Sequence, residues 1–66
     1  MQIFVNGQVR GLSVPLTVAG LLGELGLAER RLAVEVNREI VPRSRHETHQ
    51  LNDGDHVELV QAMGGG

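Results

Sequence analysis

Alternating hydrophobic and polar residues predict a strand at the start of the chain. In MQIFVN the first, third and fifth residues fall on one face and the others on the opposite face, a period typical of a half-buried strand. Asn6-Gly7 follows, and both residues tolerate the positive φ of a tight hairpin turn. A second strand is therefore expected over residues 8–14. Two registers are open, because a two-residue loop pairs Val9 with Phe4 and a three-residue loop pairs it with Val5.

A hydrophobic stripe with helical spacing comes next. It consists of Val18, Leu21, Leu22 and Leu25, at positions i, i+3, i+4 and i+7. Thr17 is the expected N-cap, and Gly26 suits the left-handed position after the helix, with Leu27 folding back in a Schellman motif. Gly20 and Gly23 lie inside the helix and each cost about 1 kcal/mol relative to alanine. Packing must therefore hold this helix.

Three further strands are predicted in the second half of the chain. LAVEVN alternates over residues 32–37, and Asn37-Arg38 makes a turn into a short strand at residues 39–41. Pro42 ends that strand because proline cannot donate a hydrogen bond to a ladder. HVELVQAM forms the last strand, over residues 56–63.

The order of these elements predicts the fold class. One helix laid across one face of a mixed five-strand sheet is the economical packing for strand, strand, helix, strand, strand, strand. We therefore expect an α+β protein with a single domain over residues 1–66.

Composition excludes several classes of function. The 66 residues include no cysteine and no lysine, six arginines, one aromatic residue (Phe4) and a net charge of −2. Disulfides and thiolate metal sites are excluded, and the charge and lack of aromatics argue against nucleic acid. No bilayer-spanning run or signal segment is present. We expect a cytoplasmic protein, monomeric when free, that contacts neither nucleic acid nor membrane.

Candidate catalytic groups have ordinary structural explanations. His46 and His49 are three apart in the polar segment RSRHETHQ, whereas a zinc-protease helix needs four; a surface loop with one helical turn is expected and no metal. Asp53 and Asp55 flank a glycine, as in a tight turn before a strand. A domain this small has little room for an enzyme pocket. We expect no catalytic residue, no bound cofactor and no enzyme activity.

The segment QAMGGG at residues 61–66 is the most suggestive feature. A glycine tail stays flexible unless it is gripped, and it could be a frayed end or a leftover linker. Alternatively, an extended glycine segment, which has no side chains, can enter a narrow active site of another protein. Its carboxylate becomes an acyl donor once it forms a mixed anhydride with a nucleotide.

Three stretches carry a resemblance to a known family. QIFVNG, AVEVNREIVPRS and LNDGDHVELVQAMGG, together with the length of the chain, resemble the ThiS family. These sulfur carrier proteins of thiamine biosynthesis have a ubiquitin-like β-grasp fold. The similarity covers the whole chain. Gly-Gly alone is weakly specific, and VNREIVPRS with the short length favours the thiamine branch.

The resemblance implies how the tail works. Gly66 would be adenylated by an E1-like enzyme of the ThiF type, which consumes ATP, and converted to a thiocarboxylate. The sulfur would come from a donor and pass to a thiazole synthase of the ThiG type. Gly65 and Gly66 match the family's diglycine, and Gly64 and Gly65 would thread into the partner.

A docking surface also follows from the β-grasp arrangement. There the first and last strands are neighbours, so Phe4, Val60 and Ala62 should form an apolar strip on the sheet face that the helix leaves uncovered, and exposed patches of this kind mark partner surfaces. Phe4 could instead be an ordinary half-covered residue. The alternative docking site is Arg43 and Arg45.

Two other functions stay open at this stage. The small subunit of molybdopterin synthase uses the same tail chemistry with another receiver, although such proteins tend to be longer. A ubiquitin-like interaction module without sulfur chemistry is the alternative from another class.

Overall fold

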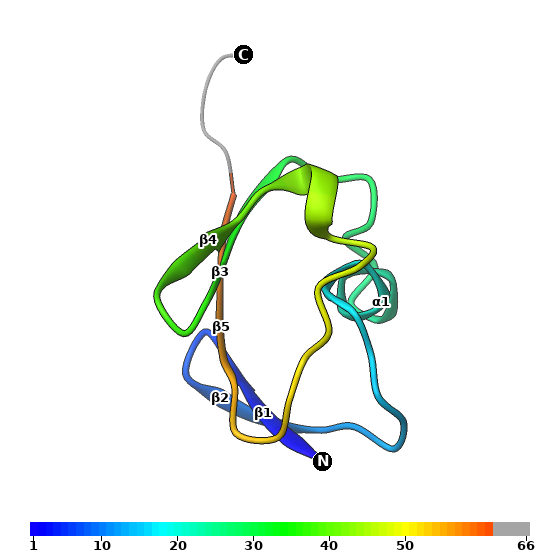
Figure 1. Ribbon diagram of the computed structural model, residues 1–66, viewed down its shortest axis with the longest axis vertical. Coiled ribbons are helices and arrows are strands. Elements are labelled where there is room, and N and C mark those ends of the chain that lie inside the picture. Colours follow the sequence, from blue (N-terminus) through cyan, green and yellow to red (C-terminus); the bar gives the residue numbers. More distant parts are fainter. Residues whose placement is uncertain (62–66) are drawn as a thin grey trace.

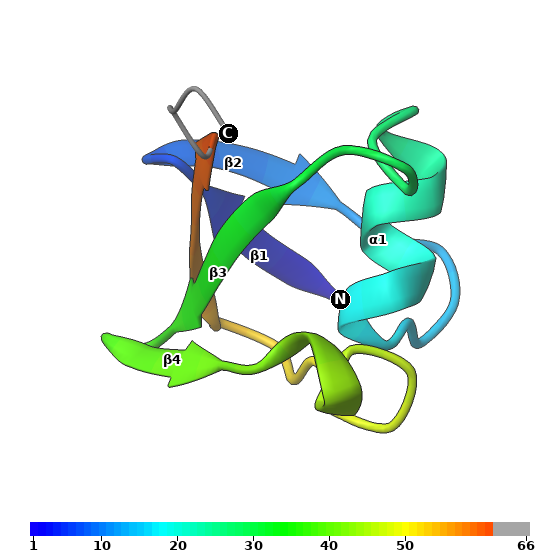
Figure 2. The ribbon, with the colours of Figure 1, turned by 90° about the horizontal axis from the view of Figure 1, so that it is seen from above.

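The computed structural model describes residues 1–61. The strands and helices are β1 (Gln2–Val5), β2 (Gln8–Gly11), α1 (Val18–Glu24), β3 (Leu32–Val36), β4 (Glu39–Val41), the 3₁₀ turn η1 (Arg43–Arg45) and β5 (His56–Gln61). The strands form one sheet in the order β2-β1-β5-β3-β4 (Figure 1). The β1–β5 pair is parallel and the others are antiparallel, and α1 lies across one face (Figure 2). The predicted fold class is confirmed.

The first hairpin turns where Asn6-Gly7 predicted it. Both residues have positive φ, 49° and 83°, and Phe4 pairs with Val9, which selects the two-residue loop. The expected length of the second strand was wrong, because β2 ends at Gly11 rather than at residue 14. Gly11 pairs with Gln2, the first residue of β1. One more hydrogen bond follows, from the Leu12 N–H to the carbonyl of Met1. Because β1 begins at Gln2, residues 13 and 14 have no β1 residue with which to pair.

Both ends of α1 follow the sequence prediction. Thr17 Oγ1 accepts a hydrogen bond from the Gly20 N–H at 3.1 Å. Gly26 has φ of +73°, and the Leu27 N–H donates to the Leu22 carbonyl at 2.8 Å. This bond, with that from Gly26 to the Gly23 carbonyl, completes the Schellman motif. The helix is therefore defined at both ends although two of its seven residues are glycine.

The core lies between α1 and the sheet. Its most deeply buried side chains are Ile3, Val18, Leu21, Val34, Leu51 and Val57. Leu51 belongs to no helix or strand; its N–H donates to the Leu16 carbonyl at 2.9 Å, which ties residues 50–51 to the start of the helix. Leu25, on the predicted stripe, is only half-buried.

The segment after β3 also agrees with its sequence pattern. Asn37 and Arg38 turn with φ of 52° and 71°, and Pro42 separates β4 from η1. Residues 43–50 form the expected surface loop with one helical turn. Within residues 1–61, no helix has the length and apolar character needed to cross a bilayer.

Candidate functional site

The strand that leads to the glycines is the middle strand of the sheet. β5 pairs with β3 from Val57 to Gln61, and its first two residues, His56 and Val57, pair with β1. Further along, the Leu59 N–H donates to Asn6 Oδ1 at 2.8 Å. Thus strands or turns hold β5 on both sides up to Leu59. Ala62, Gly64, Gly65 and Gly66, four of the predicted site residues, lie outside the described residues.

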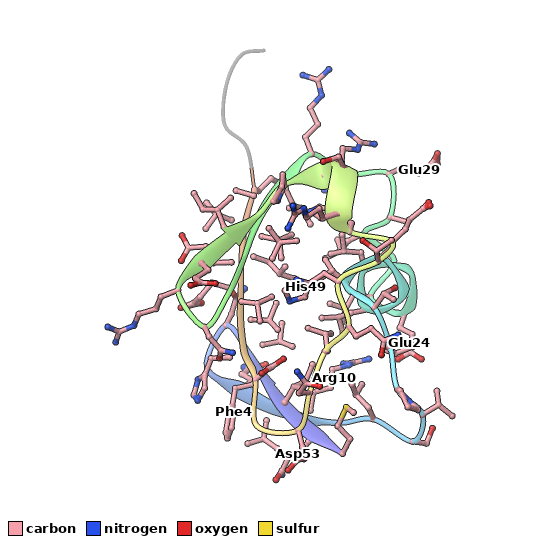
Figure 3. All side chains as sticks on the ribbon, viewed as in Figure 1. Phe4, Arg10, Glu24, Glu29, His49 and Asp53 are labelled. Carbon is pink, nitrogen blue, oxygen red and sulfur yellow. The ribbon has the colours of Figure 1, made fainter. Side chains whose placement is uncertain are left out.

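The other two predicted docking residues lie on the sheet face opposite α1. Phe4 is half-buried and Figure 3 shows it on the side away from the helix, while Val60 is 56% exposed. They are not adjacent: Phe4 pairs with His56 across the parallel strands, and Glu58 lies between His56 and Val60 on the same face. Whether partners dock here stays a prediction.

Phe4 has a partner that the sequence analysis missed. Its ring stacks on the His56 imidazole, with centroids 4.5 Å apart and an interplanar angle of 12°. His56 is exposed, so the stack presents a flat aromatic surface partly open to solvent. This contact depends on the register of β1 and β5, two parallel strands that are far apart in the sequence. The alternation of hydrophobic and polar residues does not predict that register.

The uncovered face carries further apolar residues with carboxylates among them. Val9 pairs with Phe4 and is 57% exposed; Ile40 pairs with Glu35 and is 73% exposed. Glu58 pairs with Glu35 on the same face. This surface therefore combines an aromatic stack with separate aliphatic side chains, rather than one continuous apolar strip.

The aspartates of NDGD hold a turn, as expected. Asp55 is buried; its carboxylate accepts hydrogen bonds from Asn37 Nδ2 at 3.0 Å and from the Asn52 N–H at 2.7 Å. Asp53 Oδ1 accepts from the Gln2 N–H at 2.7 Å. The two carboxylates thus accept hydrogen bonds that hold the turn before β5 against the β3–β4 turn and the start of β1, and the turn interpretation is confirmed.

One of the two loop histidines, His46, contacts the end of β4. His46 Nε2 lies 3.1 Å from the Val41 carbonyl oxygen, which fixes the imidazole against the end of β4. Residues 1–61 contain no cluster of three or more histidine, aspartate or glutamate side chains that could hold a metal ion. Arg43 and Arg45, the alternative docking residues, are both exposed on η1.

The order β2-β1-β5-β3-β4 with parallel β1 and β5 and one helix over one face defines a ubiquitin-like β-grasp protein. The model of the ThiS family matches residues 3–66, and the chain belongs to the ThiS family. The crystal structure of the thiamine biosynthesis protein ThiS from Geobacter metallireducens superposes with a TM-score of 0.87 at 35% identity, over the full length of both chains.

Similar proteins include a sulfur carrier and two thiazole synthases. The sulfur carrier protein ThiS of Escherichia coli is 36% identical over the full length of both chains. The thiazole synthases of Paramagnetospirillum magneticum and Magnetococcus marinus are 48% and 36% identical over 66 residues. All of this chain aligns with them, but it spans only 20% of their length.

Proposed function

We propose that this chain is a sulfur carrier of thiamine biosynthesis and that Gly66 carries the sulfur. The supporting observation is the full-length similarity to the ThiS of Escherichia coli, together with the family match over residues 3–66. Molybdopterin synthase has no comparable support, because the matching family is ThiS.

The chemistry requires two steps on the Gly66 carboxylate. An E1-like enzyme of the ThiF type would use ATP: a carboxylate oxygen attacks the α-phosphorus and pyrophosphate leaves, which gives an acyl adenylate. A donor of sulfide-level sulfur would then form a C–S bond at the acyl carbon as the C–O bond to AMP breaks, which leaves a thiocarboxylate and free AMP. The chain acts as a co-substrate rather than an enzyme, in the cytoplasm, where the partner's ATP is available.

The fold supports this role because β5, the strand that precedes the tail, is fixed in the sheet. β5 is bonded to β3 as far as Gln61, and the five residues that follow can span at most roughly 16–18 Å. Gly64 and Gly65 would thread into the partner, because only glycine brings the backbone that close to a reacting centre without a side chain in the way.

The thiazole synthase of the ThiG type is the proposed receiver of the sulfur. Support comes from two thiazole synthases that each contain a segment similar to this whole chain. We propose that Phe4, Val60 and Ala62 contribute to docking on the uncovered face, with the Phe4–His56 stack as its aromatic part.

Deletion of Gly66 tests the proposed function. We expect the shortened chain to melt as the wild type does, because the core described above uses no residue after Leu59, and to support no ATP–pyrophosphate exchange by the activating enzyme. Insertion of one alanine after Ser13, in the exposed segment 13–15 between β2 and α1, is the control and should leave exchange intact. Exchange by the deletion variant at the wild-type rate would disprove the assignment of Gly66.

Mass spectrometry of the chain from its native host distinguishes a carrier from an interaction module. A fraction with one terminal oxygen replaced by sulfur is expected. A uniformly unmodified chain in cells that are making thiamine would favour the module instead.

A further inference from the structure

Two adjoining hollows lie between α1, the start of β3 and η1. Their volumes are about 270 and 310 Å³, and both are lined by Leu22, Ala28, Arg43 and His46. The larger one adds Arg30, Arg31 and Leu32. We call this continuous depression, with the arginines at 30, 31 and 43, the basic groove.

The basic groove concentrates positive charge on an acidic protein. Its three arginines are all exposed, and Glu47 is the carboxylate that lines it. The chain has a net charge of −2, so without these three arginines its remainder has a formal charge of −5. Such an asymmetric distribution steers negatively charged partners toward one end of a molecule.

The floor of the groove is apolar. Leu22 is buried in the core, Leu32 is half-buried, and Ala28 is exposed. Arginine recognises carboxylates through a planar fork of donors and is less strongly hydrated than lysine. The three arginines form the rim of the groove. Together the rim and the apolar floor are complementary to an apolar side chain flanked by carboxylates. A bare phosphate would use the rim and leave the floor open to water.

The position of the groove connects it with the tail. Leu32, in the groove, pairs with Gln61, the last described residue of β5. Figure 1 shows η1 and the segment between α1 and β3 at the same end of the molecule as the end of β5. A protein that takes up residues 62–66 must therefore approach this end.

We propose that the basic groove docks an acidic segment of the activating enzyme, consisting of an apolar side chain flanked by aspartate or glutamate. This inference rests on the proposed function, since that enzyme is its partner. The groove promotes association with the enzyme and orients the carrier on it. The uncovered sheet face is a separate surface, on the side of the sheet opposite α1.

The test is ATP–pyrophosphate exchange by the activating enzyme of the same organism, at several salt concentrations. The double variant R30E/R43E should raise KM about tenfold at low salt with kcat unchanged, because rim charges act on association. The wild-type KM should rise with salt while that of the double variant stays flat. Arg38→Glu and Glu24→Lys each reverse one charge outside the groove, a change of two units in net charge; Arg38 lies in the β3–β4 turn.

Each outcome supports or overturns the assignment of the basic groove as a docking site for the activating enzyme. A KM raised only by the groove variant, with unchanged melting, supports the proposal. A double variant with wild-type KM and salt dependence overturns it and leaves the proposed function standing. Equal effects per charge from Arg38→Glu would show that net charge alone matters. Saturable binding of inorganic phosphate that inhibits exchange would assign the groove to a small anion. If the wild type supports no exchange, the proposed function fails and this inference fails with it.

Discussion

At the scale of single residues, Asp55 is the buried polar group on which the start of β5 depends. One carboxylate oxygen accepts from the Asn37 side chain, and the other accepts from the Asn52 N–H. Asn37 Oδ1 in turn accepts from the His56 N–H at 3.0 Å. This small network joins the β3–β4 turn, the turn before β5 and the first residue of β5.

Replacing Asp55 with alanine should lower the free energy of unfolding by about 1–3 kcal/mol, because two donors in partly buried hydrogen bonds then lose their acceptor. Urea denaturation followed by circular dichroism measures the change. Asp53→Ala is the matched control: Asp53 is exposed and accepts one hydrogen bond, so about 1 kcal/mol or less is expected. Equal losses for the two variants would contradict the role given to Asp55.

At the scale of elements, α1 has two glycines in different surroundings. A Cβ on Gly23 would meet no atom within 4 Å, whereas a Cβ on Gly20 would lie 3.2 Å from Leu16 Cδ2. Leu16 packs against the core, so it has limited freedom to move away. The two positions therefore separate helix propensity from packing.

Gly23→Ala should raise the free energy of unfolding by about 0.5–1 kcal/mol, because alanine restricts the unfolded chain and the site has room for the methyl group. Gly20→Ala should gain less, since the contact with Leu16 offsets the same entropy. Thermal and urea unfolding of both variants provide the comparison. A loss of stability in Gly23→Ala would show that glycine is required there for another reason.

Local sequence signals were sufficient for most elements. Asn6-Gly7 gave the first turn, Thr17 the N-cap and Gly26 the C-terminal motif, because each depends on neighbours within a few residues. Leu51 was not predicted in the core, because it lies in an irregular segment without periodicity. The overlong second strand had a similar cause: the pattern does not say where the partner strand starts.

Candidate site residues were predictable where they follow from strand alternation and from the arrangement of the β-grasp family. Alternation separated Phe4 from Ile3 and Val5, and the β-grasp arrangement implied by the family resemblance placed Val60 on the same face as Phe4. The Phe4–His56 stack depends in addition on the parallel register of β1 and β5. The basic groove collects Arg30 and Arg43 from segments on either side of β3 and β4. Only the tertiary fold brings them together.

At the scale of the whole molecule, the uncovered sheet face makes a testable contribution to docking. Phe4→Ser should raise KM for the activating enzyme and for the sulfur acceptor while the fold survives, because it removes binding energy and leaves the reacting group unchanged. Val14→Ser is the control, since Val14 is 54% exposed but lies outside the sheet. Titration of each variant against each partner measures the effect. Wild-type affinity of Phe4→Ser for both partners would exclude this face.

The central place of β5 also governs how the chain can fold during its synthesis. The β1–β2 and β3–β4 hairpins are local, but β5 lies between β1 and β3, and among residues 1–61 no other strand joins the two hairpins. Its bonds reach far back along the chain, as from Leu59 to Asn6 across 53 residues. Such distant pairing slows folding. The ribosome must therefore deliver β5 before the two hairpins can share one sheet, and until then both keep an unpaired edge exposed to aggregation.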